Sequence, residues 1–110
     1  MNFAPLPEVA PAAVPSDGYL LDVREADEWA AGHAERAVHI PMSELVARIA
    51  EIPTDRRVHV VCRVGGRSAQ VAQYLIAQGY DAVNVAGGML DWAASGLPLT
   101  TDDDTPATIV

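Results

Sequence analysis

Cys62, the only cysteine of this 110-residue chain, stands where a reactive thiolate could be built. It follows the apolar run Val58–Val61, which is typical of a buried strand, and it begins a glycine-rich loop that leads into a helical pattern over residues 69–78. Gly65 and Gly66 let backbone N–H groups turn toward one point, and the following helix adds its positive end there. The loop therefore favours an anion, whether a thiolate, a persulfide or a bound oxyanion.

A lone cysteine is more often a small buried hydrophobic residue than a reactive group. The neighbours favour the reactive interpretation, because Arg63 and Arg67 lie in the same loop and arginine is rarely buried without a partner. Cationic neighbours and a helix N-terminus lower the pKa of a thiol. We therefore predict that Cys62 is a nucleophile and that its loop binds an anion, either a substrate or a persulfide on Cys62. The loop residues are Arg63, Val64, Gly65, Gly66, Arg67 and Ser68. Ser68 either bonds the persulfide or only caps the helix.

Composition narrows the class of protein. A net charge of -8 argues against general nucleic-acid binding, which depends on clustered lysine and arginine. A single cysteine forms no internal disulfide, and no segment has the roughly twenty apolar residues that cross a bilayer, so we expect a cytoplasmic protein that binds no membrane. The three histidines show no metal-ligand spacing, so we predict no metal and no cofactor.

The pattern of apolar runs predicts an α/β domain with strands and helices in alternation. We expect strands over residues 19–23, 37–40, 58–61 and 81–85, and helices over 25–31, 43–50, 69–78 and 88–92. Strands separated by such helices form a small parallel sheet flanked by helices on both faces. Ligands of parallel sheets bind at the carboxyl ends of the strands, which is where Cys62 stands.

Three segments divide the chain. Residues 1–18 contain four prolines and are expected to form an extended lead-in, residues 19–99 the folded domain, and residues 100–110 an acidic flexible tail. Asp22 and Arg24 follow the first predicted strand at the same end of the sheet as Cys62. They either form a structural ion pair or shape the rim of the pocket.

Four motifs, in order, resemble the rhodanese homology family of sulfurtransferases. They are Leu21 to Glu25 with Glu28-Trp29, Gly32-His33 with residues 37–41, the loop from Cys62 to Ser68, and residues 87–92. The resemblance runs from about Tyr19 to Pro98 and is to the single-domain rhodaneses. It implies a rhodanese-like fold. Residues 1–18 depart from the family pattern, which leaves that edge of the sheet unassigned.

The resemblance implies a thiosulfate sulfurtransferase with a two-step reaction. The thiolate of Cys62 would take the sulfane sulfur of a small anionic donor such as thiosulfate, and a thiol or cyanide acceptor, with thioredoxin or glutathione as cellular candidates, would remove it. Loop N–H groups would stabilise the sulfur anion, and Arg63 and Arg67 would hold the sulfonate of the donor. We expect a monomer.

Other functions stay open on the sequence alone. A persulfide carrier would deliver sulfur to one protein partner with little turnover of small acceptors, and a rhodanese-like binding module would transfer none. A cysteine phosphatase or arsenate reductase needs an arginine six positions after the cysteine, and Ser68 stands there instead.

Overall fold

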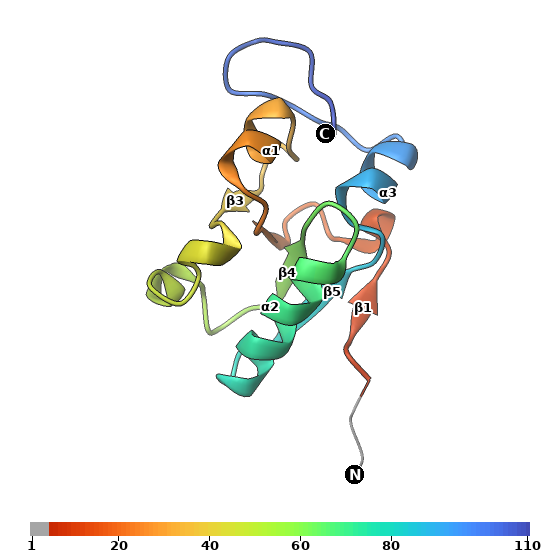
Figure 1. Cartoon of the computed structure of the whole chain (residues 1–110). Coiled ribbons are helices and arrows are strands. Elements are labelled where there is room, and N and C mark those ends of the chain that lie inside the picture. The colour runs from red at the N-terminus through yellow and green to blue at the C-terminus, as the bar shows by residue number, and fades with distance from the viewer. Residues whose placement is uncertain (1–4) are drawn as a thin grey trace.

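The computed structural model describes residues 5–110 and contains a five-stranded sheet in which every strand pairing is parallel (Figure 1). The order across the sheet is β1-β5-β4-β2-β3. The strands are β1 (Glu8–Val9), β2 (Tyr19–Asp22), β3 (Val38–His39), β4 (Val58–Val61) and β5 (Ala82–Val85). Strand β4 therefore lies at the centre, and the end that precedes Cys62 is flanked by the ends of β2 and β5.

Helices connect the strands. The α-helices are α1 (Ala26–Ala31), α2 (Gly66–Ala77) and α3 (Gly88–Ala94), and the 3-10 helices are η1 (Pro11–Ala13), η2 (Met42–Glu44) and η3 (Ile49–Glu51). Helix α1 begins as expected for its sequence, because the Glu25 and Glu28 side chains form a reciprocal capping box. None of the helices within residues 5–110 combines the length and apolar composition needed to cross a membrane.

The core lies on both faces of the sheet. On one face, Val58 and Val60 of β4 pack with Val71 and Leu75 of α2. On the other face, the alternate side chains of the strands pack with Met89 and Trp92 of α3, and with the chain around η1. The predicted fold class, a small parallel sheet with helices on both faces, is confirmed.

The helix predicted over residues 43–50 is wrong. The segment forms the two short 3-10 helices η2 and η3 instead, and Arg48 between them has φ −111° and ψ 13°, outside the helical region. Pro41 precedes the first of these turns and Pro53 follows the second, and the backbone leaves the helical conformation at Arg48 between them. Its apolar side chains still reach the core, because Leu45 and Ile52 are buried.

Both ends of the described chain contact the domain. Within the predicted lead-in, β1 pairs with β5 as the edge strand, Glu8 opposite Asn84. Residues 1–4 lie outside the described part of the chain. Near the other end, Thr100 pairs with His33 in an isolated antiparallel bridge, and the N–H of Thr108 donates to the carbonyl of Ala31. Residues 100–110 thereby arch over α1 (Figure 1).

Candidate active site

Cys62 lies directly after β4, at the carboxyl end of the sheet, and only 1% of its surface is exposed. The chain then turns through Gly65, which has φ +114°, and enters α2 at Gly66. This turn points the N–H of Gly65 at the Cys62 sulfur over 3.1 Å, and the hydroxyl of Ser68 lies 3.2 Å from the same atom. The left-handed turn and the start of α2 thus converge on one sulfur.

These contacts determine whether the sulfur of Cys62 is more stable as a thiol or as a thiolate. Burial on its own raises the pKa of the Cys62 thiol, but hydrogen bonds outweigh it: those from the Ser68 hydroxyl and from the backbone N–H groups of Ser68, Gly65 and Val64 leave the pKa below its usual value. Val64 contributes through its backbone, since its side chain is exposed. The loop is therefore built to stabilise a thiolate.

Helix α3 holds the loop in this shape from behind. The N–H groups of Met89 and Leu90 donate to the carbonyls of Cys62 and Arg63 over 2.8 and 3.1 Å. Gly88 permits the approach, because a Cβ atom there would lie 2.5 Å from each of these two carbonyl oxygens. With both carbonyls turned toward α3, the loop N–H groups are left to face the sulfur.

A series of hydrogen-bonded side chains extends from the sulfur of Cys62 to β1 at the edge of the sheet. The hydroxyl of Ser68 lies 2.6 Å from Oδ1 of Asn84 on β5. The amide nitrogen of Asn84 donates to the carbonyl of Gly65 over 3.2 Å and to the carboxylate of Glu8 on β1 over 3.1 Å. Three segments distant in sequence, the loop from Cys62 to Ser68, β5 and β1, therefore meet in one network behind Cys62.

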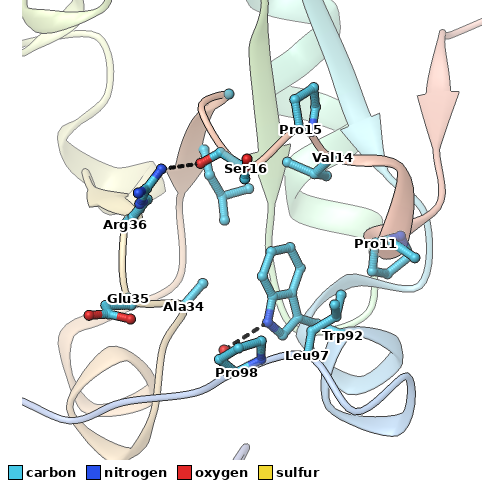
Figure 2. A pocket seen from close by; sticks show the side chains of 13 residues that line it. Pro11, Val14, Pro15, Ser16, Ala34, Glu35, Arg36, Trp92, Leu97 and Pro98 are labelled. Atoms are coloured by element: carbon cyan, nitrogen blue, oxygen red, sulfur yellow. Dashed lines mark hydrogen bonds between the residues drawn. The ribbon is translucent and has the colours of Figure 1, made fainter.

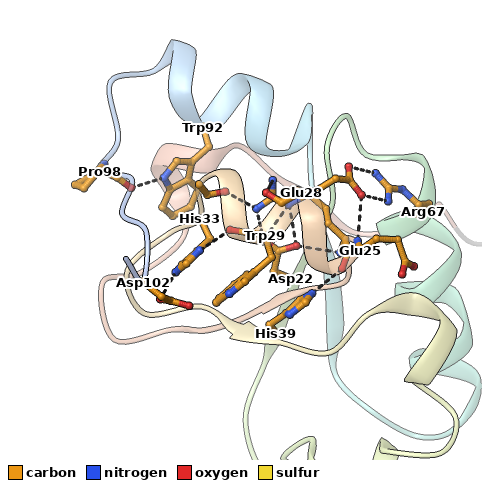
Figure 3. A network of polar contacts seen from close by, with 12 residues as sticks. Asp22, Glu25, Glu28, Trp29, His33, His39, Arg67, Trp92, Pro98 and Asp102 are labelled. Carbon is orange, nitrogen blue, oxygen red and sulfur yellow. Dashed lines mark hydrogen bonds and ion pairs between the residues drawn. The ribbon is translucent and has the colours of Figure 1, made fainter. Parts of the chain in front are cut away.

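Arg67 reaches from α2 across the site to α1. Its two terminal nitrogens donate to the two carboxylate oxygens of Glu28 over 2.7 and 2.8 Å (Figure 3). This bidentate pair lowers the pKa of Glu28 to about 2, chiefly through the hydrogen bonds from Arg67. The same bonds raise the pKa of Arg67, and a charge on Cys62 raises it further.

Arg63 makes a different contact, with the last residue of the described chain. Its Nε donates to the carbonyl oxygen of Val110 over 2.9 Å, which brings the end of the described chain beside the loop. The two loop arginines therefore contact groups of this chain itself.

Gly66, at the start of α2, has open space beside it, since a Cβ atom there would meet nothing within 4 Å.

Asp22 and Arg24 form an ion pair that is completely buried. Arg24 donates to the Asp22 carboxylate through Nε and a terminal nitrogen, the latter over 2.8 Å. Its other bonds reach the carbonyls of Glu28 and Gly32 in and after α1. Neither side chain is exposed, so the pair acts on the site by holding α1, and with it Glu28, against the end of β2.

Stacked rings fix the remaining side of α1. The Trp29 ring lies between His33 and His39, with centroid distances of 3.6 and 4.6 Å and nearly parallel planes (Figure 3). The Nε2 atom of His33 lies 3.2 Å from Asp102, a residue of the arching C-terminal segment. The position of α1, and therefore of Glu28, depends on contacts with three other parts of the chain.

A separate pocket of about 270 Å³ lies elsewhere on the domain (Figure 2). It is lined mainly by apolar side chains, among them Pro11, Val14, Ala34, Trp92 and Leu97. No residue of the loop from 62 to 68 contributes to it. Over residues 5–110, no group of three histidine, cysteine, aspartate or glutamate side chains is arranged to hold a metal ion.

Four residues that the structure brings to the site were not predicted from the sequence as site residues: Glu8, Glu28, Asn84 and Gly88. Asn84 could have been recognised from the sequence, because it is a polar residue inside an otherwise apolar run of a buried strand. Glu28 was noted only as part of a motif. Glu8 and Gly88 act through contacts that depend on how distant segments pack.

Comparison with known proteins identifies the family. The model of the rhodanese-like domain matches residues 8–95, which is most of the chain and includes β1. The chain belongs to the rhodanese-like domain family. A sulfurtransferase of Allochromatium vinosum is 42% identical to this rhodanese-like domain over 88 residues, covering 79% of this chain and 82% of that protein.

Two further relatives extend the comparison. A putative sulfur carrier protein of Bacillus subtilis is 37% identical over 98 residues, which is 83% of this rhodanese-like domain and 53% of that longer protein. The crystal structure of a rhodanese-related protein from Thermoplasma volcanium superimposes with a TM-score of 0.82 at 29% identity, covering 87% of this chain and 99% of that one. The family resemblance drawn from the sequence motifs is confirmed.

Proposed function

We propose that this rhodanese-like domain is a sulfurtransferase that moves sulfane sulfur from a small anionic donor, thiosulfate or a similar compound, through a persulfide on Cys62. The observation that carries the proposal is the sulfur of Cys62 inside a cradle of hydrogen-bond donors that lowers its thiol pKa. The thiolate is the nucleophilic form of cysteine. Relatives named sulfurtransferase support the same class of reaction.

The reaction would consist of two displacements on sulfur. The thiolate of Cys62 attacks the sulfane sulfur of thiosulfate, a new S–S bond forms, and the electron pair of the old S–S bond leaves with sulfite. The acceptor, cyanide or a thiol such as glutathione or that of thioredoxin, then attacks the outer sulfur, and the electron pair of the second S–S bond returns to Cys62. The loop N–H groups stabilise the negative sulfur in both resting forms. We place the activity in a reducing compartment such as the cytoplasm, because the thiol must stay reduced.

The direct test is the mass of the protein after treatment with thiosulfate. We expect freshly reduced protein to gain about 32 Da, one sulfur atom, and to lose it again when cyanide is added. The Cys62→Ser variant should gain nothing. An unchanged mass of the wild-type protein in excess thiosulfate would overturn thiosulfate as the donor.

Arg67 is the group that we propose holds the sulfonate of the donor. Both of its terminal nitrogens bind Glu28, so the donor must share the guanidinium with that carboxylate or displace it. We expect Arg67→Ala to raise the KM for thiosulfate by about five- to tenfold, the loss of one charge-assisted contact, with a smaller change in kcat. Steady-state kinetics with cyanide as acceptor measure both constants.

The matched control is Arg48→Ala, which also removes an arginine paired with glutamates but lies away from the loop. A normal KM in the Arg67 variant would remove that residue from the donor site.

A sulfur carrier is the second candidate function, and the relative named a putative sulfur carrier protein is the observation that favours it. A carrier and an enzyme would both form the persulfide. They differ in the second step, since an enzyme turns over with small acceptors. Formation of the persulfide without cyanide-dependent turnover would favour the carrier.

A further inference from the structure

The hydroxyl of Ser68 lies between two acceptors and has one proton to donate. Its oxygen is 3.2 Å from the sulfur of Cys62 and 2.6 Å from Oδ1 of Asn84, and all three side chains are buried. A serine hydroxyl donates a single hydrogen bond. The two acceptors therefore compete for this proton whenever the sulfur is a thiolate.

The orientation of the Asn84 amide is fixed by its other contacts. One terminal atom faces the carbonyl of Gly65 and the carboxylate of Glu8, at 3.2 and 3.1 Å. Both of these groups accept hydrogen bonds, so the atom that faces them must be the amide nitrogen. The amide oxygen is then the atom that faces Ser68.

The network accordingly has two arrangements of protons. When Cys62 is a thiol, its S–H can donate to the Ser68 oxygen while the Ser68 hydroxyl donates to Asn84, and every group is satisfied. When Cys62 is a thiolate, a hydroxyl that turns toward the sulfur leaves the buried Asn84 oxygen without that donor. Leaving a buried acceptor without a donor costs free energy, so Asn84 opposes ionisation.

We propose that Asn84 is a positioning residue that limits how far Ser68 stabilises the Cys62 thiolate, because its amide oxygen competes with the sulfur for the one hydroxyl proton. Glu8 takes part by holding the amide in the orientation that makes this competition possible. The value of such a limit for catalysis rests on the proposed function. A thiolate that is stabilised too strongly is a weaker nucleophile, and attack is fastest when the thiol pKa lies near the ambient pH.

Other charged side chains also act on the sulfur, and substitutions at Ser68 or Asn84 remove none of them. The guanidinium of Arg67 on α2 interacts with a charge on Cys62, and the carboxylate of Glu28 on α1 partly neutralises that guanidinium. Arg63 follows Cys62 in the loop and bonds to Val110, and Glu8 on β1 lies on the far side of the Asn84 amide. Asp22 and Arg24 behind α1 neutralise each other.

The experiment is the pH dependence of Cys62 alkylation by iodoacetamide, measured in the full chain without any sulfur donor. Removing the hydroxyl with Ser68→Ala should raise the midpoint by about one pH unit, a tenfold lower thiolate fraction below the midpoint. Removing the competing acceptor with Asn84→Leu should lower the midpoint by about half a unit. In the double variant the midpoint should equal that of Ser68→Ala alone.

Two more variants separate this role from a general loosening of the loop. Asn84→Ala removes the same polar atoms without filling the space, and it must also lower the midpoint even if Asn84→Leu does not fold. Asn84→Asp keeps an acceptor that faces Ser68, so the midpoint must not fall below that of the wild type. The proposal is overturned if Asn84→Ala leaves the midpoint unchanged or raises it, or if its effect persists in the Ser68→Ala background. Because no donor is present, the mass test for the persulfide can fail or succeed independently.

Discussion

Gly65 and Gly66 are adjacent in the loop, but only the first is required by the backbone. Gly65 has φ +114°, a left-handed conformation that L side chains rarely adopt, whereas Gly66 is the first residue of a regular helix. An added Cβ at Gly65 would meet its nearest neighbours only at 3.7 Å, so space is available and conformation is the limit. The two residues therefore form a matched pair for substitution.

We expect Gly65→Ala to cost about 1–3 kcal/mol of unfolding free energy, because the side chain must adopt a disfavoured conformation. Where the loop relaxes to avoid this strain, the N–H of residue 65 turns away from the sulfur and the thiol pKa rises. Gly66→Ala should be neutral or slightly stabilising, by up to about 1 kcal/mol. Urea denaturation and the pH dependence of Cys62 alkylation measure both effects. Equal losses of unfolding free energy in the two variants would contradict a role for the Gly65 turn in the hydrogen-bond cradle around Cys62.

The residues of the candidate site differ in how clearly the sequence indicates them. Cys62 and its loop could be predicted, because a strand, two glycines and a helix start are local signals within a few residues. The contact between Ser68 and Asn84 joins residues 16 apart, and that between Arg67 and Glu28 joins residues 39 apart. Such contacts depend on strand order and helix position, which no local pattern states.

At the scale of elements, α3 determines the shape of the loop through the close approach at Gly88. Gly88 and Gly79 both have positive φ, so alanine costs backbone energy at either position. Only at Gly88 would the new Cβ overlap the carbonyls of Cys62 and Arg63, while at Gly79 it meets nothing within 4 Å.

We therefore expect Gly88→Ala to reduce the rate of Cys62 persulfide formation by tenfold or more, about 1.4 kcal/mol in the barrier, because the loop must shift to make room. Gly79→Ala should lower the unfolding free energy by about 1–2 kcal/mol and leave that rate close to wild type. The rate of mass increase in thiosulfate, set beside the unfolding free energy of each variant, separates the two effects. A similar loss of rate in both variants would show that α3 does not shape the loop.

The pair between Glu28 and Arg67 joins α1 to α2, and its contribution should depend on acidity. The pKa of Glu28 is about 2 in the folded protein, below its ordinary value of 4.5. A lowered pKa means that the contribution to stability is complete above about pH 4.5 and is lost as the pH falls toward 2. In Glu28→Gln, which keeps a side chain able to cap α1, the unfolding free energy should vary less with pH in that range.

Urea denaturation at a series of pH values measures this dependence. The control is Glu44→Gln, which removes one exposed partner of Arg48 and should change the pH dependence little. If the wild-type and Glu28→Gln proteins lose stability in parallel between pH 4.5 and 2, the ion pair does not link the two helices energetically.

Prediction of elements from the sequence succeeded where the signals were local. The valine-rich strand β4 and the capped helix α1 follow from apolar runs and end residues. The segment over residues 43–50 has an apolar stripe of helical spacing, but two prolines bound it and the short chain closes into 3-10 turns. Strand β1 could not be predicted, because two residues carry no periodicity and its pairing with β5 closes over a distance of 76 residues.

For the whole molecule, the sequence predicted the class of fold and a position for Cys62 at the carboxyl end of the sheet. The alternation of strands and helices implies parallel pairing, and parallel pairing brings the ends of β2, β4 and β5 together. The interlocking of α1 with the rest of the domain was beyond prediction. It depends on the stacking of Trp29 on His39 and on the contact of His33 with Asp102, which join different segments of the chain, whereas the ion pair of Asp22 with Arg24 joins neighbours in sequence and was one of the two predicted alternatives.

The outer strands of the sheet are its shortest. Strands β1 and β3 have two residues each, and Pro7 and Pro41 stand close beside them, so neither exposed edge offers a ladder on which another chain could be templated. The aggregation-prone segment is the valine-rich strand β4, which lies in the interior and is covered on both faces. Aggregation of this protein on heating should therefore begin only after the sheet has opened. Its kinetic stability against aggregation is then governed by the rate of unfolding rather than by contacts between native molecules.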